Sequence, residues 1–154
     1  MSSRIARFAL SGYRIAGIAA YPFAKPYLSY RAAKGKEDKR RRLERFGYAS
    51  AERPRGPLVW FHAASVGETL ALIPLIREIR KRDIFVLLTT GTVTSAELTR
   101  TRLGDDVIHQ YVPLDIKIAV NRFLTYWAPD AAITAESEIL SLIHISEPTR
   151  PERI

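Results

Sequence analysis

The 154-residue sequence contains no cysteine and only three histidines, which excludes several common kinds of site. Without cysteine the chain forms no disulfides and offers no thiolate ligands to a metal. The histidines, at His62, His109 and His144, are too widely spaced to give a metal-binding pattern. The G-x-G-x-x-G and Walker patterns are also missing, so no motif indicates a dinucleotide or a nucleoside triphosphate. The sequence therefore predicts neither a metal nor a cofactor.

A long hydrophobic run is missing from the amino-terminal arm. Its longest uncharged stretch has ten residues, whereas a membrane-spanning helix needs roughly 20. Residues 1–30 are nevertheless largely apolar, and Arg4, Arg7 and Arg14 fall within about an 80° arc of a helix. Such a narrow cationic stripe is typical of an amphipathic helix that lies in a membrane interface. Packing against its own domain is the alternative, whereas a cleaved signal peptide fits less well because the arginines interrupt the apolar region.

Acidic residues are scarce in the first third of the chain. Residues 1–55 hold 14 basic and 4 acidic side chains, for a net charge of +10. The remaining 99 residues hold 10 basic and 12 acidic side chains, for a net charge of −2. A basic region thus precedes a nearly neutral one. Its partner is expected to be a polyanion, either an anionic lipid surface or a nucleic acid.

The positive charge is densest in Lys34–Arg45, KGKEDKRRRLER, which has seven basic and three acidic residues. Directly after an apolar amphipathic helix, such a run predicts a second, electrostatic attachment to anionic headgroups, here through Arg40, Arg41 and Arg42. A nucleic-acid partner requires an aromatic stacking platform among the charges, and only two aromatic residues lie close by. We therefore predict a membrane partner and no nucleic acid. Residues 31–56 as a whole are interpreted as a basic segment and a linker.

From residue 57 onward, strand-like and helix-like patterns alternate. Strands are predicted at 57–63, 84–90, 107–112 and 130–136, and helices at 67–81, 94–103 and 115–126. Elements that alternate at these lengths form right-handed βαβ units. We therefore expect an α/β fold, with a Rossmann-like parallel sheet over residues 57–139. Pro74 is expected to kink the first of these helices or to delay its regular part.

The stretch Pro57–Glu68, PLVWFHAASVGE, is the first strand, turn and helix start of this domain. Its apolar residues do not alternate with polar ones, which suits a strand buried on both faces. Ser65 and Glu68 are three residues apart before an apolar helix, which is the spacing of a capping box. Gly67 is interpreted as keeping the turn narrow. On spacing alone Glu68 has a structural role, but ligands bind beyond the carboxyl ends of parallel strands, which leaves a functional role open.

The second strand is followed by hydroxyl groups and a glycine. Thr90, Gly91 and Thr92 stand at the start of the next helix, where backbone N–H groups and hydroxyls form a cradle for a phosphate or an oxyanion. They serve equally well as helix caps, and Thr94 with Glu97 repeats the capping-box spacing. Both interpretations remain open.

The fourth strand ends at two carboxylates. Glu136 and Glu138 are two residues apart, so they share one face of a strand, and two like charges there are costly without a compensating group. Carboxylates at such a strand end favour a functional role. The candidate substrate-binding residues are Ser65, Gly67, Thr90, Gly91, Thr92 and Glu136.

Several sequence blocks carry a specific resemblance to one enzyme family. From about Tyr30 to Ile139, GKED and RLERFG are followed in order by HAASVGETLALIPLIREIR, TTGTVTSAEL, VIHQYVPLDI, NRFLTYWAPD and AESEI. Together these blocks resemble the amino-terminal half of the bacterial Kdo transferases, where Kdo is 3-deoxy-D-manno-octulosonic acid. The resemblance implies half of a glycosyltransferase-B fold, in an enzyme that moves Kdo from CMP-Kdo to a lipid A precursor without a metal. It also implies lipopolysaccharide biosynthesis at the cytoplasmic face of the bacterial inner membrane.

The same resemblance assigns roles to two glutamates. It implies that Glu68 is the general base and that Glu138 stabilises the transition state. The donor is expected mainly on a second domain that this chain does not include, so the chain is expected to be an inactive fragment. After Ile139, the string LSLIHISEPTR resembles the translation of a transposase adapter, and residues 140–154 are therefore expected to be a non-native tail. The alternative function is a non-enzymatic, basic α/β module that binds an anionic membrane or nucleic acid.

Overall fold

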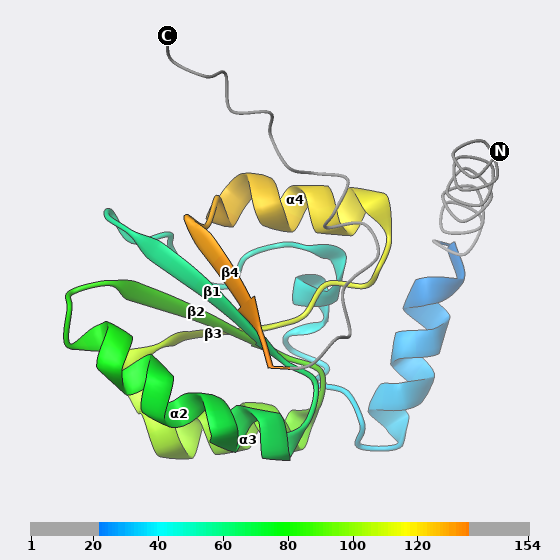
Figure 1. The fold of residues 1–154 in the computed structure, drawn as a ribbon. Helices are drawn as coiled ribbons and strands as arrows, with labels where there is room; N and C mark the ends of the chain where they lie inside the picture. The colour runs from blue at the N-terminus through cyan, green and yellow to red at the C-terminus, as the bar shows by residue number, and fades with distance from the viewer. Residues whose placement is uncertain (1–21, 136–154) are drawn as a thin grey trace, which may run out of the picture.

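The computed structural model describes residues 22–135, and its centre is a four-stranded parallel sheet. The strands are β1 (Leu58–Ala63), β2 (Phe85–Thr90), β3 (Ile108–Tyr111) and β4 (Ala131–Thr134). They lie in the order β3-β2-β1-β4, so β1 pairs with β2 on one side and with β4 on the other (Figure 1). Several predicted residues lie outside the described residues: Arg4, Arg7, Arg14, Glu136, Glu138 and residues 140–154.

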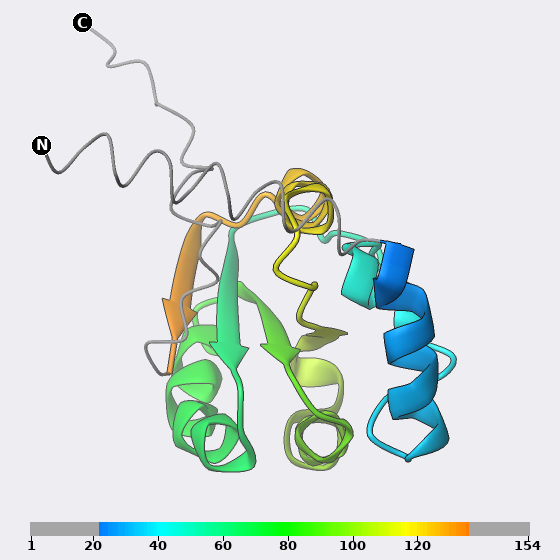
Figure 2. The ribbon, with the colours of Figure 1, turned by 90° about the vertical axis from the view of Figure 1, so that its right-hand side faces the viewer.

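Helices cover both faces of the sheet. α2 (Val66–Arg80) and α3 (Val93–Leu103) pack on one face, and α4 (Lys117–Trp127) packs on the other (Figure 1 and Figure 2). The remaining helical segments are η1 (Arg42–Phe46), η2 (Gly104–Asp106) and a helix over residues 22–33. The predicted α/β fold with a parallel sheet is confirmed, and each strand and helix predicted from residue 57 onward agrees within two residues at both ends. Within residues 22–135, no helix has both the length and the apolar character needed to cross a bilayer.

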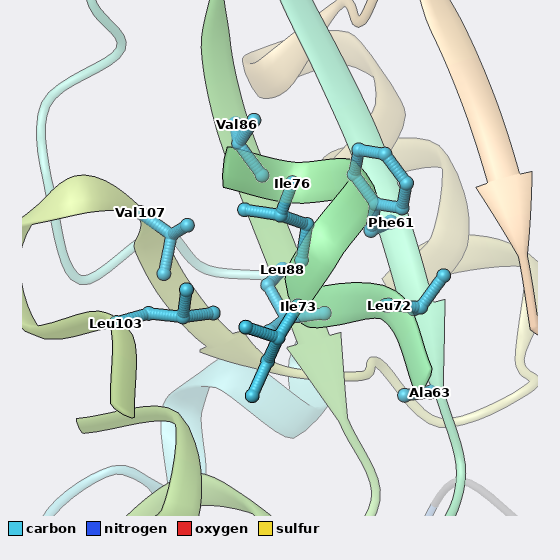
Figure 3. Close-up of a cluster of buried hydrophobic side chains, with 9 residues drawn as sticks. All are labelled: Phe61, Ala63, Leu72, Ile73, Ile76, Val86, Leu88, Leu103 and Val107. Atoms are coloured by element: carbon cyan, nitrogen blue, oxygen red, sulfur yellow. The ribbon is translucent and has the colours of Figure 1, made fainter. Parts of the chain in front are cut away.

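The strand β1 is apolar throughout because its two faces contribute to two different hydrophobic clusters. Phe61 points toward α2 and packs in one cluster with Ile76, as the labelled side chains of Figure 3 show. Trp60 belongs to the cluster on the opposite face, where its ring lies 4.9 Å from the ring of Phe123 in α4. Trp60 and Phe61 are both almost completely buried. The sequence-based expectation of a strand without a wet face is therefore confirmed.

The helix α2 begins after its N-cap residue Ser65 and runs unbroken through Pro74. The predicted delay of its regular part is wrong. A proline inside a helix removes the hydrogen bond to the carbonyl four residues earlier, which here belongs to Leu70. Leu70 and Pro74 both lie on the exposed side of the helix. Solvent can therefore satisfy the carbonyl that the proline leaves unbonded, which explains why the helix tolerates it.

Residues 31–56 differ from the predicted basic linker because much of this segment packs against the domain. η1 buries three of its residues, and one of them, Phe46, belongs to a hydrophobic cluster with Leu28 and with Ala119 of α4. Gly47 ends η1 with a φ of +81°. A Cβ at this position would lie 2.0 Å from the carbonyl oxygen of Ala119, so only glycine fits.

Candidate functional site

The sheet order predicts a ligand-binding crevice beyond the carboxyl ends of β1 and β4. From β1 the chain passes to β2 and β3 on one side of the sheet and then returns to β4 on the other side of β1. In parallel α/β sheets, ligands bind where the strand order reverses in this way. Ala135, directly after β4, donates its N–H to the carbonyl oxygen of His62 in β1 at 3.1 Å. β4 thus brings the chain, at Ala135, to the end of β1.

Glu68 lies at this crevice because β1 leads directly into α2. Ser65 is the N-cap of α2, and its hydroxyl oxygen accepts the N–H of Glu68 at 3.3 Å. In return, the Glu68 carboxylate accepts the Ser65 hydroxyl at 2.7 Å and the N–H of Ala64 at 2.6 Å. The predicted capping box is confirmed. A Cβ on Gly67 would meet nothing closer than the Ser65 hydroxyl at 4.0 Å, so the turn is not narrow enough to require this glycine.

Hydrogen bonding keeps Glu68 in its charged form. The bond from the Ser65 hydroxyl, followed by the bond from the Ala64 N–H, lowers the pKa of Glu68 below its usual 4.5, although partial burial opposes this. The carboxylate is therefore ionised at neutral pH. Each carboxylate oxygen has about two acceptor sites, so both oxygens keep one for a ligand. Because Glu68 is only half-buried, a substrate hydroxyl in the crevice can pass its proton to this carboxylate.

Hydroxyl groups at the end of β2 and in the loop after it form hydrogen bonds within the protein. Thr90 is completely buried, and its hydroxyl oxygen lies 2.9 Å from Nε2 of His109. Thr92 is the N-cap of α3, where its hydroxyl oxygen accepts the N–H of Ser95 at 3.1 Å. The same hydroxyl donates to the Ser95 side chain at 2.9 Å. Of the two open interpretations, the contacts of both threonines match the capping and packing role.

The predicted capping pair of α3 is wrong. The cap is Thr92, two residues before Thr94, and Glu97 forms an ion pair with Arg100 one turn further along α3. Gly91 sits where two loops come close together, because a Cβ on it would lie 3.4 Å from the carbonyl oxygen of Ala64. The loop that follows β2 therefore lies against the loop between β1 and α2, which leads directly to Glu68.

Sequence analysis did not predict a buried ion pair that lies beside the loop after β2. The side chains of Arg45 and Glu37 are 7% and 1% exposed, and their charged groups lie 2.6 Å apart. Arg45 also donates to the carbonyl oxygens of Gly91 at 2.7 Å and Val112 at 3.1 Å. One guanidinium group thus holds together the loops after β2 and β3.

A second pair of charges covers the free edge of β3. Glu44 accepts the backbone N–H of Tyr111 at 2.6 Å and pairs with Arg41 at 2.7 Å. Arg41 also donates to the carbonyl oxygen of His109 at 2.7 Å. β3 is an edge strand of the described sheet, and these side chains satisfy backbone groups that would otherwise be unpaired. The sequence carried one clue, namely acidic residues within an otherwise basic run.

The same arginines affect the protonation of His109. Burial, followed by the charges of Arg41 and Arg45, lowers the pKa of His109 to about 3. In the unfolded chain the imidazole takes up a proton near its ordinary value of 6.5. The stability that rests on neutral His109 is therefore complete above pH 6.5 and decreases as the pH falls from there toward 3.

When the pH is lowered from about 7 to about 5, the free energy of unfolding is expected to fall less in the His109→Gln variant than in the wild-type protein. Glutamine still offers a hydrogen-bonding group to Thr90 but takes up no proton in the unfolded state. Urea denaturation at a series of pH values measures the difference. Equal pH dependence in the two proteins, or an imidazole of folded His109 that titrates near 6.5 by NMR, contradicts this prediction.

The fold and the site together define a class of protein. A Rossmann-like parallel sheet places an ionised carboxylate beside the crevice where the strand order reverses. Within the described part of the chain, no three histidine, aspartate or glutamate side chains gather as a metal site requires. The sheet and the carboxylate define a Rossmann-like α/β domain in which Glu68 could accept a proton from a hydroxyl group.

The comparison with known families gives this class a particular identity. A family model described as 3-deoxy-D-manno-octulosonic-acid transferase (kdotransferase) matches residues 40–144. The chain therefore belongs to the Kdo transferase family, which is a family of glycosyltransferases, and the resemblance found in the sequence is confirmed.

Individual relatives agree with this assignment. A probable mitochondrial 3-deoxy-D-manno-octulosonic acid transferase from Arabidopsis thaliana is 42% identical over 129 residues, which cover 82% of this chain and 29% of the relative. The 3-deoxy-D-manno-octulosonic acid transferase of Haemophilus influenzae is 33% identical over 129 residues, covering 80% of this chain and 30% of the relative. The 3-deoxy-D-manno-octulosonic acid transferase of Rickettsia bellii is 39% identical over 107 residues, which cover 68% of this chain and 26% of the relative. The matched part of this chain thus spans less than a third of the length of these relatives.

Proposed function

We propose that this chain provides the acceptor-binding domain of an enzyme that transfers Kdo from CMP-Kdo to a lipid A precursor. The observation that carries the proposal is Glu68, an ionised carboxylate beside the crevice at the carboxyl ends of β1 and β4. Membership of the Kdo transferase family supports a sugar donor and a lipid acceptor. In this proposal a second domain of a glycosyltransferase-B fold binds most of the CMP-Kdo, and the reaction uses no metal and no cofactor.

Glu68 acts as the general base in the proposed reaction. A sugar hydroxyl is a weak nucleophile, so its proton passes to Glu68 while its oxygen forms a bond to the anomeric carbon of Kdo. The bond between that carbon and the phosphate of CMP breaks, and CMP leaves as an anion. The lowered pKa keeps Glu68 ready to accept the proton, and the Ser65 hydroxyl holds the carboxylate in place. Glu138, proposed to stabilise the transition state, and Glu136, proposed to bind substrate, lie outside the described residues.

Because the proposed acceptor is a lipid, we place the enzyme at the cytoplasmic face of the bacterial inner membrane. The helix over residues 22–33 supports this, since Phe23, Tyr27 and Tyr30 are 72%, 55% and 57% exposed. Their spacing puts the three rings on one face of the helix. Exposed aromatic rings of this kind suit the headgroup region of a bilayer. Arg41 is left out of the proposed membrane surface, because its guanidinium group is paired inside the domain.

The proposed function is tested by comparing this chain with the same chain extended by a second family domain. Each protein is given CMP-Kdo and a lipid A precursor, and transfer is followed by mass spectrometry of the lipid. We expect transfer only by the extended protein. In calorimetry, CMP should bind the present chain more weakly than about 10 μM, or roughly −7 kcal/mol.

Two outcomes contradict this proposal in different ways. Absence of transfer by the extended protein shows that the proposed reaction is wrong. Transfer by the 154-residue chain alone, or tighter CMP binding by it, shows instead that the donor site lies within this domain.

A further inference from the structure

A cavity of about 420 Å³ lies between the helix over residues 22–33 and the segment that contains η1. Figure 2 shows these two parts of the chain side by side. Four cationic side chains line the cavity, and none of its lining residues is acidic. The four are Lys25, Lys39, Arg40 and Arg42. Cavities of this size hold small molecules or headgroups, and the charge of this one favours an anion.

The cations near η1 include two sets with different partners. Arg41 and Arg45 face the sheet, where each is paired with a buried glutamate. Among residues 22–135, no side chain forms an ion pair with Lys25, Lys39 or Arg40. The first set is neutralised inside the fold. The second set keeps its full charge around the cavity and is available to an outside anion.

One cation of the cavity is held in a fixed position. Arg42 donates one N–H to the hydroxyl of Ser29 at 2.8 Å and another to the carbonyl oxygen of Lys39 at 3.3 Å. These bonds tie the guanidinium group to both walls of the cavity, so less side-chain entropy is lost when it binds an anion.

Apart from Ser29, the rest of the cavity lining is apolar. Leu28 and Phe46 are buried, at 2% and 5% exposure, and also belong to the hydrophobic cluster with α4. Leu43 lines the cavity as well but is 63% exposed. An anion with an apolar portion therefore fits this site better than a simple inorganic anion, because it uses both the charges and the apolar wall.

We propose that this cavity binds the phosphate-containing headgroup of an anionic phospholipid, with the start of its acyl chains against Leu43, the exposed apolar residue of the lining. The inference rests on the proposed membrane location and names the residues that recognise the lipid. Nucleic acid is a poorer match. Phe46, the aromatic residue that lines the cavity, is buried and offers no exposed face on which a base can stack.

The test measures binding of the 154-residue chain to vesicles by co-sedimentation at fixed ionic strength. Vesicles contain phosphatidylcholine alone or phosphatidylcholine with phosphatidylglycerol. Wild-type protein is expected to bind the anionic vesicles more tightly. The triple variant Lys25→Gln/Lys39→Gln/Arg40→Gln should lose about 100-fold in affinity for them, since each cation near an anionic surface contributes about a factor of five.

A charge-matched control separates the cavity from net charge. The variant Arg55→Gln/Arg82→Gln/Lys117→Gln also removes three exposed cations, none of which lines the cavity. It should bind the anionic vesicles within a few-fold of wild type. Ser29→Leu fills the cavity without changing the charge and is expected to weaken binding. Circular dichroism confirms that each variant is folded before binding is compared.

The outcomes distinguish this inference from the proposed membrane location. Equal losses in the two triple variants leave membrane binding intact but overturn the cavity as its site. Displacement from vesicles by inorganic phosphate at constant ionic strength, or tighter binding of single-stranded RNA, also overturns the phospholipid assignment. If wild-type protein binds neither kind of vesicle, both the cavity and the membrane location are wrong.

Discussion

Replacement of Glu68 by Gln in the extended, two-domain protein is expected to lower kcat about 100-fold or more, with little change in KM. Glutamine has the size of glutamate and still accepts one of the hydrogen bonds from Ala64 and Ser65. It cannot take the proton of the acceptor hydroxyl. Because the pKa of Glu68 is already lowered, wild-type activity should not depend on its protonation at neutral pH.

The matched control for this substitution is Glu78→Gln, which makes the same chemical change further along α2. Glu78 is exposed and pairs with Lys81, away from the crevice, so kcat should stay near the wild-type value. Transfer of Kdo under saturating donor and acceptor measures both variants, and thermal unfolding checks that they are folded. A Glu68→Gln protein with nearly wild-type kcat contradicts the base assignment and leaves Glu68 only its capping role.

Replacement of Arg45 by Met is expected to lower the free energy of unfolding by about 3–5 kcal/mol. The substitution leaves Glu37 buried at 1% exposure with Arg31, at 3.2 Å, as its remaining cation. It also removes the donors that Gly91 and Val112 now have. Small domains are stable by only about 5–15 kcal/mol, so this single change removes a large part of the total.

A double variant shows whether the cost comes from the unpaired carboxylate. Glu37→Leu together with Arg45→Met removes both charges, so it should destabilise the protein less than Arg45→Met alone. The exposed pair in α3 gives the comparison, because Arg100→Met breaks an ion pair that is surrounded by water and should have little effect. Urea denaturation measures all three proteins. An Arg45→Met protein as stable as wild type contradicts the role of the buried pair.

Local features of the sequence determined the elements of the domain and the placement of Glu68. The alternation of strand and helix patterns predicted every bound within two residues, because periodicity is a property of neighbouring residues. The capping box of α2 was also predictable, since Ser65 and Glu68 are only three residues apart. In contrast, the cap of α3 was misplaced because Thr92 and Thr94 are equally suitable residue types in a threonine-rich turn.

Only the tertiary structure decided which polar side chains form hydrogen bonds and ion pairs within the protein. Arg40 and Arg41 are identical neighbours in the sequence, yet Arg41 reaches the carbonyl of His109, 68 residues away, whereas the side chain of Arg40 lines a cavity. Similarly, Thr90 is buried against His109 although a hydroxyl after a strand is typical of a binding loop. These outcomes depend on where η1 meets the edge of β3. Contacts between such distant segments leave no periodic pattern in the sequence, because they depend on how already formed elements pack.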